Sequence, residues 1–210
     1  MTRGRFITLE GIEGAGKTTI CKALEAALQA RGQRCIITRE PGGTPLAEQI
    51  RTLVLERRGE TVNPTAELLL MFAARAVHLD NLVRPSLARG DWVICDRFTD
   101  ATRAYQGAGR GVDRALIESL ASAVHADCEP DRTLLLDLPV ELGLARARQR
   151  RGDAATDRFE SETSAFFTRV REGYLSLAAA APARIRVIDA SRPAQEVSAA
   201  AQTALAEWLA

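Results

Sequence analysis

The chain has 210 residues, 46% of them hydrophobic, which fits one domain built around one core. Its 28 Lys and Arg nearly balance its 27 Asp and Glu, and the resulting formal net charge of +1 argues against a general binder of nucleic acids or anionic membranes. No apolar run is long enough to span a bilayer, no signal-peptide segment is evident, and the four cysteines lack the spacing of a zinc site or disulfide framework. We therefore expect a cytoplasmic protein without a nucleic-acid or membrane partner.

Short β-branched runs alternate with longer helical stretches, a pattern typical of α/β proteins with a parallel sheet. Four of the five runs are almost continuously apolar, as in strands buried on both faces. In chain order, the sequence predicts a strand at 6–9, a helix at 17–30, a strand at 35–38, helices at 45–57 and 64–88, a strand at 92–95, a helix at 113–126, a strand at 133–136, helices at 140–150 and 160–180, a strand at 185–188 and a helix at 194–209.

Two segments depart from this regular pattern. Apolar residues in the stretch 64–88 follow a helical period only loosely, so part of this helix is expected to face something other than the core. The polar segment 151–157 contains a glycine, and its composition favours a surface loop between two helices.

The segment from Gly11 to Thr18 fits the phosphate-binding pattern GxxxxGK[ST] and stands between a predicted strand and a predicted helix, as that loop requires. Its glycines allow backbone N–H groups to converge on phosphate oxygens, Lys17 would reach the outer phosphates, and the Thr18 hydroxyl would coordinate Mg²⁺. Only two of the 28 basic residues are lysines, which suggests that this position needs a compact ammonium group. The residues assigned to ATP in this segment are Gly11, Ile12, Glu13, Gly14, Ala15, Gly16, Lys17, Thr18 and Thr19.

Asp96 and Arg97 directly follow the predicted strand 92–95. At the carboxyl end of a parallel strand beside the phosphate loop, Asp96 could help to hold the metal, although it could equally cap the following turn. Arg97 would be well placed to pair with the phosphate of a second substrate.

A phosphoryl-transfer site needs further cations, which the variable positions of the phosphate loop do not supply. The segment 146–158 carries five arginines against two aspartates, a local charge of +3, and Arg146 and Arg150 are spaced to share a helical face. A solvated basic surface is one explanation, and a mobile lid beside a glycine-containing insert is the other. The five arginines are Arg146, Arg148, Arg150, Arg151 and Arg158.

Five further segments extend the match beyond the phosphate loop. They read TREPGGT at 38–44, FAAR at 72–75, DRF at 96–98, AYQG at 104–107 and DRFE at 157–160. With these segments in this order, the chain resembles the bacterial thymidylate kinases from Phe6 to about Ile188. The resemblance implies a P-loop fold with a five-stranded parallel sheet flanked by helices and a lid near 146–158, a homodimer, ATP and Mg²⁺, and direct in-line phosphorylation of dTMP to dTDP.

The resemblance also implies roles for single residues. The thymine ring would stack on Phe72 and be hydrogen-bonded by Arg75, while Arg51 and Arg97 would grip the dTMP phosphate. Glu13 would receive the 3′-hydroxyl of the sugar. The residues assigned to dTMP are Glu13, Glu40, Pro41, Arg51, Phe72, Arg75, Arg97, Thr102, Tyr105 and Gln106.

Some members of this family carry a catalytic arginine in the phosphate loop, but here Gly14 follows Glu13. The lid must then supply it, and Arg151 is the first candidate, with Arg148 and Arg158 behind it. Lys17 and Asp96 complete the predicted catalytic set, with Thr18 and Asp96 as the metal ligands. The residues expected around adenine are Arg146, Ala190, Ser191 and Arg192.

Two alternatives are testable. A kinase for another nucleoside monophosphate or a deoxynucleoside would lack the paired phosphate-gripping arginines or the TREPGG segment. A P-loop switch or regulatory ATPase would hydrolyse the triphosphate, but lysine occurs only at 17 and 22, so the chain cannot contain the NKxD segment of a guanine-specific switch.

Overall fold

The computed structural model describes residues 3–56, 59–152, 158–159 and 162–209. Five parallel strands form one sheet in the order β2-β3-β1-β4-β5, which confirms the predicted parallel sheet. The strands are β1 (Phe6–Glu10), β2 (Cys35–Arg39), β3 (Trp92–Asp96), β4 (Arg132–Asp137) and β5 (Ile185–Asp189). Because β1 and β3 are adjacent and parallel, the segments that follow them lie side by side at the carboxyl ends of the strands, where the chain leaves β1 toward β2 and leaves β3 toward β4.

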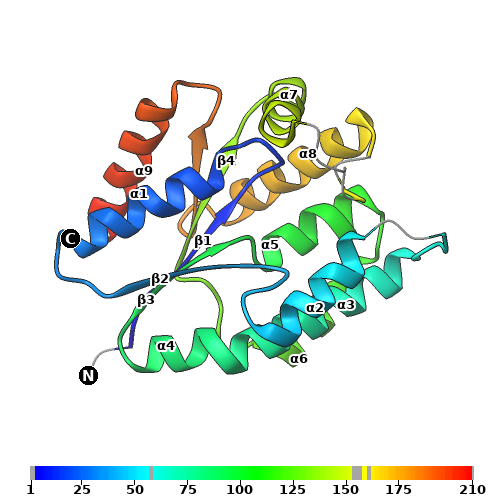
Figure 1. Ribbon diagram of the computed structural model, residues 1–210, viewed down its shortest axis with the longest axis horizontal. Coiled ribbons are helices and arrows are strands. Elements are labelled where there is room, and N and C mark those ends of the chain that lie inside the picture. Colours follow the sequence, from blue (N-terminus) through cyan, green and yellow to red (C-terminus); the bar gives the residue numbers. More distant parts are fainter. Residues whose placement is uncertain (1–2, 57–58, 153–157, 160–161, 210) are drawn as a thin grey trace.

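The helices cover both faces of the sheet (Figure 1). On one face, Ile7, Leu9 and Ile94 join a core with α1 and α9, and on the other Phe6 and Val93 pack against η1 and α4. The helices are α1 (Lys17–Gln29), α2 (Pro45–Leu55), α3 (Pro64–His78), α4 (Arg84–Ala88), α5 (Thr99–Thr102), α6 (Arg114–His125), α7 (Val140–Arg151), α8 (Ser164–Ala180) and α9 (Ala194–Leu209), with two π-helical segments, η1 (Leu79–Val83) and η2 (Arg103–Gly109).

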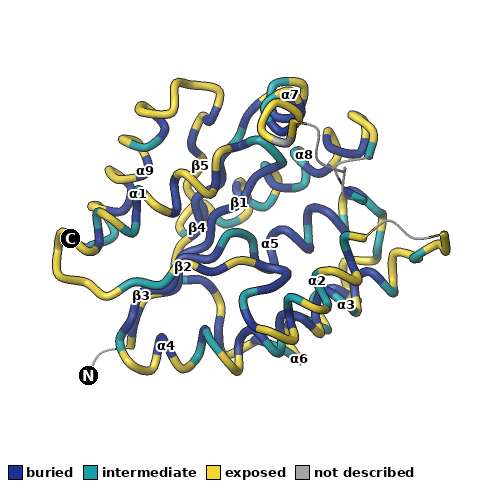
Figure 2. Tube along the Cα trace, viewed as in Figure 1, coloured by how far each residue is buried: buried dark blue, intermediate teal, exposed yellow. Residues whose placement is uncertain are grey.

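Strand position decides which apolar runs are buried. All five residues of β1 are buried, and β3 and β4 are buried except at their ends (Figure 2). By contrast, β2 lies at a sheet edge and is only partly covered, with Ile37 exposed. The apolar run Cys35–Thr38 is therefore an edge strand, not a strand covered on both faces.

The predicted helix 64–88 is divided into α3, η1 and α4. A π-helical turn holds an extra residue and shifts the phase of the side chains that follow it. Leu68 and Phe72 consequently pack with Ile117 in a small cluster beside α6, whereas Leu79 and Val83 pack onto the sheet. This change of face explains the loose apolar period.

The segment 99–109 forms α5 and η2, where the sequence predicted no helix. Its two glycines and its π-helical hydrogen bonding obscure the usual helical period. Within the residues that the structure describes, no helix has the length and apolar character needed to cross a membrane.

Candidate active site

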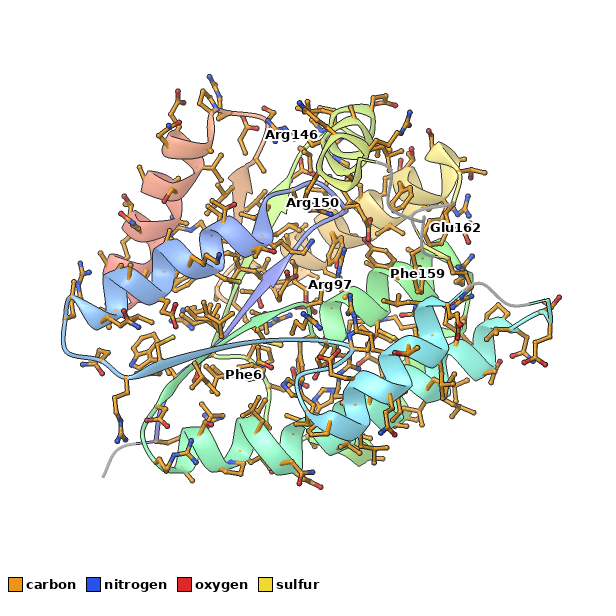
Figure 3. The ribbon with its side chains drawn as sticks, in the orientation of Figure 1. Phe6, Arg97, Arg146, Arg150, Phe159 and Glu162 are labelled. Atoms are coloured by element: carbon orange, nitrogen blue, oxygen red, sulfur yellow. The ribbon has the colours of Figure 1, made fainter. Side chains whose placement is uncertain are left out.

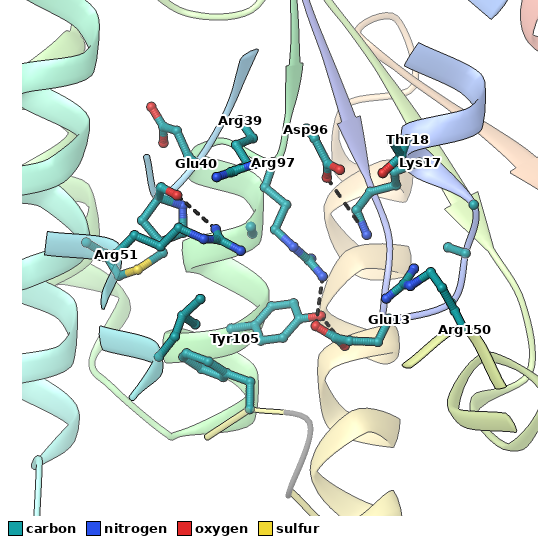
Figure 4. Close-up of a pocket in the computed structure, with 18 of the residues that line it drawn as sticks. Glu13, Lys17, Thr18, Arg39, Glu40, Arg51, Asp96, Arg97, Tyr105 and Arg150 are labelled. Atoms are coloured by element: carbon teal, nitrogen blue, oxygen red, sulfur yellow. Dashed lines mark hydrogen bonds and ion pairs between the residues drawn. The ribbon is translucent and has the colours of Figure 1, made fainter. Parts of the chain in front are cut away.

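A cavity of about 680 Å³ opens at the carboxyl ends of β1, β2 and β3 (Figure 4). Its lining comes from segments that are distant in sequence: the phosphate loop with the start of α1, the end of β2 and the residues after it, α2, α3, the end of β3 and the residue after it, α5 with η2, α7, and Phe159. In Figure 4, Lys17, Thr18 and Arg150 surround one end of this cavity, and Glu40 and Arg51 lie at the other.

The phosphate loop is folded as its sequence predicts. Gly14 and Gly16 have φ values of 75° and 89°, in the left-handed region that glycine allows. The Lys17 ammonium donates to the carbonyls of Gly11 (3.0 Å) and Ile12 (3.2 Å), and burial lowers its pKa. Residues 13–19 all line the cavity, and Gly11 and Ile12 lie buried beneath it.

Arg97 is held between the phosphate loop and α8. It donates to Glu13 Oε1 (2.9 Å), to the Gly11 carbonyl (2.9 Å) and to the Tyr174 hydroxyl (3.1 Å). Tyr105 donates to the other Glu13 oxygen (2.7 Å), and the Arg97 guanidinium lies 4.7 Å from the Tyr105 ring centroid. The structure thus joins Glu13, Arg97 and Tyr105 in one cluster and adds Tyr174, which the sequence analysis missed.

The wall opposite the phosphate loop contains Glu40, Pro41, Arg51, Tyr105 and Gln106, all predicted for dTMP. Arg51 reaches across to donate to the Pro41 carbonyl at 2.8 Å.

The structure does not bring Phe72, Arg75 or Thr102 to this wall. Phe72 packs into the cluster beside α6, and Arg75 is buried against Glu40 and Thr102. Met71 lines the cavity instead, one residue before Phe72. Met71 and Arg75 are four residues apart and Phe72 and Arg75 are three apart, so both pairs share a helical face and the spacing alone does not distinguish Met71 from Phe72.

Of the basic residues on α7, Arg146 and Arg150 line the cavity (Figure 3). Arg148 is exposed and does not line the cavity, as expected two positions away on a helix. The side chain of Arg151 and the residues 153–157 lie outside the part of the chain that the structure describes. Arg158 is held elsewhere, on Glu67 of α3 (2.6 Å) and the Val54 carbonyl of α2 (3.0 Å).

The phosphate loop and α7 touch through two glycines. A Cβ at Gly14 would collide with the backbone of Gly143, and a Cβ at Gly143 would lie 2.7 Å from the Glu13 carbonyl. No side chain fits at position 14 while α7 is packed here, which is a physical reason against an arginine at that position.

A second cavity of about 270 Å³ lies on the other side of the loop, between Gly16 and the segment after β5. Arg146 borders both cavities and donates to the carbonyls of Ala190 (2.7 Å) and Ser191 (3.2 Å). Arg192 also lines this second cavity and pairs with Asp189 (3.2 Å). The four residues predicted around adenine therefore lie together.

Two side chains beside the phosphate loop offer oxygen atoms as possible metal ligands, Asp96 and the exposed Thr18. The Asp96 carboxylate lies 4.0 Å from the Lys17 ammonium. Across the described residues, no three acidic, His or Cys side chains cluster as a complete metal site.

The thymidylate kinase family model matches residues 9–201. The chain belongs to the thymidylate kinase family. The thymidylate kinase of Methylococcus capsulatus is 56% identical over 210 residues, covering 100% of this chain and 99% of that protein. The thymidylate kinase of Chromohalobacter salexigens is also 56% identical, over 211 residues and with the same coverage. Among solved structures, the crystal structure of thymidylate kinase from Ehrlichia chaffeensis matches with a TM-score of 0.77 at 35% identity, covering 97% of this chain and 99% of that one.

Proposed function

We propose that the chain transfers the γ-phosphoryl group of ATP directly to the phosphate of dTMP, within the 680 Å³ cavity and without a phosphoenzyme. As a thymidylate kinase it phosphorylates dTMP to dTDP with ATP. The observation that carries the direct mechanism is the single cavity that joins the phosphate loop to the wall of Glu40, Arg51 and Gln106. Both substrates can meet there, and the acceptor phosphate is already an anion, so no strong general base is required.

On the donor side, the phosphate loop and Lys17 would bind the triphosphate, with adenine beside Arg146 and Arg192. Mg²⁺ fits the residues present, because it usually takes one or two protein oxygens and completes its octahedron with phosphates and water. Thr18 and Asp96 would hold it. When bound, the ion neutralises charge on the β- and γ-phosphates.

On the acceptor side, Arg51 and Arg97 supply the cations for the dTMP phosphate. Glu13, already hydrogen-bonded by Arg97 and Tyr105, would accept the 3′-hydroxyl of the sugar. Met71 lines this end of the cavity and would face the base where the sequence predicted Phe72, and Arg75 lies one helical turn further along α3.

The transition-state cation would come from α7, whose packing against Gly14 leaves no room for an arginine at position 14. Arg150 lines the cavity, and Arg151, the first choice from sequence, follows it. We expect Arg150→Ala or Arg151→Ala to lower kcat by about 100-fold, in the range for removal of a donor to developing charge. Steady-state release of ADP with ATP, Mg²⁺ and dTMP measures this.

Arg148→Ala is the matched control, since it removes an equal charge from the opposite side of α7, and its kcat should stay within about threefold of wild type. If Arg150→Ala and Arg151→Ala both kept the kcat of Arg148→Ala, the transition-state cation would belong to another residue. The same assay with dUMP, dCMP and thymidine tests the acceptor, and ATP hydrolysis that dTMP does not change would contradict the kinase mechanism.

We also propose that the chain forms a homodimer in the cytoplasm. The family resemblance predicts this assembly, and α2 carries two exposed leucines, Leu46 and Leu53, seven residues apart on one face. No contact between copies tests it, so the homodimer stays a prediction.

A further inference from the structure

A buried hydrogen-bonded network stands behind the cavity wall at Glu40. Arg75 Nε donates to Glu40 Oε2 at 2.7 Å, and His78 Nδ1 lies 2.9 Å from Glu40 Oε1. The other ring nitrogen of His78 lies 2.7 Å from the Thr38 hydroxyl. We call these four residues, Thr38, Glu40, Arg75 and His78, the Arg75 network. Each of them is at most 7% exposed.

The chemistry of the groups sets the direction of the hydrogen bonds to Glu40. A carboxylate can only accept, so His78 Nδ1 carries a proton and donates to Glu40, while the Thr38 hydroxyl can either donate to or accept from Nε2. Burial alone would raise the pKa of Glu40, but the Arg75 charge and the His78 hydrogen bond bring this pKa below its usual value. Glu40 is therefore an anion with both oxygens occupied.

Arg75 is fixed by contacts around its guanidinium. Besides Glu40, it donates from Nη2 to the Thr102 hydroxyl at 3.0 Å, and its Cζ lies 4.8 Å from the Phe72 ring centroid and 5.0 Å from that of Phe98. Its remaining terminal nitrogen, Nη1, is buried and has no hydrogen-bond partner within the described part of the chain. A buried donor left unpaired costs free energy, so Nη1 favours a ligand that brings an acceptor.

We propose that His78 and Thr38 are positioning residues, which act through Glu40 to orient Arg75, the residue that the family resemblance assigns to a hydrogen bond with the thymine base. The inference rests on the proposed function, because Arg75 lies beside the dTMP end of the cavity. Thymine offers a carbonyl acceptor where cytosine offers an amino group that cannot accept. The Arg75 network thereby sets the preference for dTMP over dCMP.

Gly43 supports this network from outside. A Cβ there would lie 2.5 Å from the Thr38 hydroxyl oxygen and 2.7 Å from His78 Nε2. The backbone at Gly43 therefore packs directly on the Thr38–His78 hydrogen bond and shields it from water.

The chain also contains a matched control. His125 is buried, with Nε2 2.7 Å from the Thr99 hydroxyl and Nδ1 3.1 Å from the Glu129 carboxylate. The order of groups is the same, but within the described residues Glu129 makes no ion pair with an arginine. A variant that removes the Thr99 hydroxyl disturbs a similar Thr–His contact and leaves every hydrogen bond of the Arg75 network in place, although the His125 ring packs on Phe72 and Phe98.

The test compares Thr38→Val, His78→Leu and His78→Asn with Thr99→Val by steady-state kinetics on dTMP and dCMP at saturating ATP and Mg²⁺. We expect Thr38→Val and His78→Leu to raise KM for dTMP about five- to tenfold, to change kcat less than about threefold, and to lower the ratio of kcat/KM for dTMP over dCMP. His78→Asn keeps an N–H donor toward Glu40 and should restore part of this ratio. Thr99→Val should leave KM and the ratio as in wild type.

Thermal unfolding of each variant separates stability from positioning. If Thr38→Val and Thr99→Val show the same KM and the same dTMP:dCMP ratio, the inference is wrong. Should His78→Leu fail to fold, Thr38→Val decides alone, because it exchanges a hydroxyl for a methyl of similar size. Absence of dTMP turnover by the wild type would instead overturn the proposed function, and the inference with it.

Discussion

Arg97 shows how far a single residue depends on neighbours that are distant in sequence. The resemblance placed it in the acceptor site, but its backbone is left-handed at φ 73°, an uncommon conformation for a residue other than glycine. Its guanidinium is held by three acceptors, of which Tyr174 lies on α8. The Tyr174 hydroxyl in turn donates to Glu10 at 2.7 Å. Tyr174 therefore connects β1 to the arginine that would grip dTMP.

Removing the Tyr174 hydroxyl should loosen Arg97 without removing its charge. We expect Tyr174→Phe to raise KM for dTMP about three- to fivefold while KM for ATP changes less than about twofold, in line with the loss of one hydrogen bond. Steady-state kinetics with each substrate varied in turn checks this. An equal rise in both KM values would point to a general loss of packing instead.

The sequence could predict Arg97 and Glu13 because each belongs to a short segment with a recognisable pattern. It could not predict Tyr174, which occupies an ordinary apolar-face position of a long helix, 77 residues beyond Arg97. The sequence predicted Phe72 at the cavity, where the structure has Met71, for a similar reason. Neighbouring residues on a helix point about 100° apart, and packing against α2 and α6 decides which of them meets the cavity.

Among the elements, the segment 38–44, which runs from the end of β2 to the residue before α2, illustrates how one short motif makes several contacts. Thr38 meets His78, Glu40 meets Arg75, and the Pro41 carbonyl accepts from Arg51. The resemblance identified this segment from its order of residues. Its partners on α3 could not be predicted, since they depend on how α3 packs beside β2.

The packing of α3 against this segment requires glycine at position 43, because the φ of +87° and the contacts of Gly43 with Thr38 and His78 both disfavour a side chain. We expect Gly43→Ala to destabilise the fold by about 1–3 kcal/mol and to raise KM for dTMP, as the new methyl separates Thr38 from His78. Urea unfolding and steady-state kinetics measure the two effects.

Gly32→Ala provides the control for backbone strain. Its φ is +71°, but a Cβ there would meet nothing within 4 Å. Gly32→Ala should therefore lose only the stability due to the left-handed backbone and leave KM unchanged. If both variants behaved alike in stability and in KM, the contact of Gly43 with Thr38 and His78 would carry no functional weight.

In the whole molecule, the sheet gathers the residues proposed for both substrates at the carboxyl ends of β1, β2 and β3. Apolar runs predicted the five parallel strands, but composition alone does not give the order β2-β3-β1-β4-β5. That order places Glu10, at the end of the central strand, in complete burial beneath the anion-binding loop. Burial, and then the nearby Asp100 charge, raise the pKa of Glu10 to about 8. The carboxyl is thus largely protonated at neutral pH and adds little negative charge beside a bound triphosphate.

This raised pKa links the stability of the whole fold to pH. Glu10 ionises near pH 4.5 in the unfolded chain and near pH 8 in the folded one, so between these values the folded state holds the extra proton and stability falls as pH rises. From pH 6 to pH 8 the loss due to Glu10 should be about 2 kcal/mol. Glu10→Gln cannot titrate and should lack this loss, so its free energy of unfolding should rise relative to wild type between the two pH values. Urea unfolding of both proteins measures the difference, in which the contributions of the histidines and thiols cancel.

Glu60→Gln, at an exposed carboxylate, should show no such change with pH. A constant difference between Glu10→Gln and wild type would mean that Glu10 is already ionised in the folded protein at pH 6.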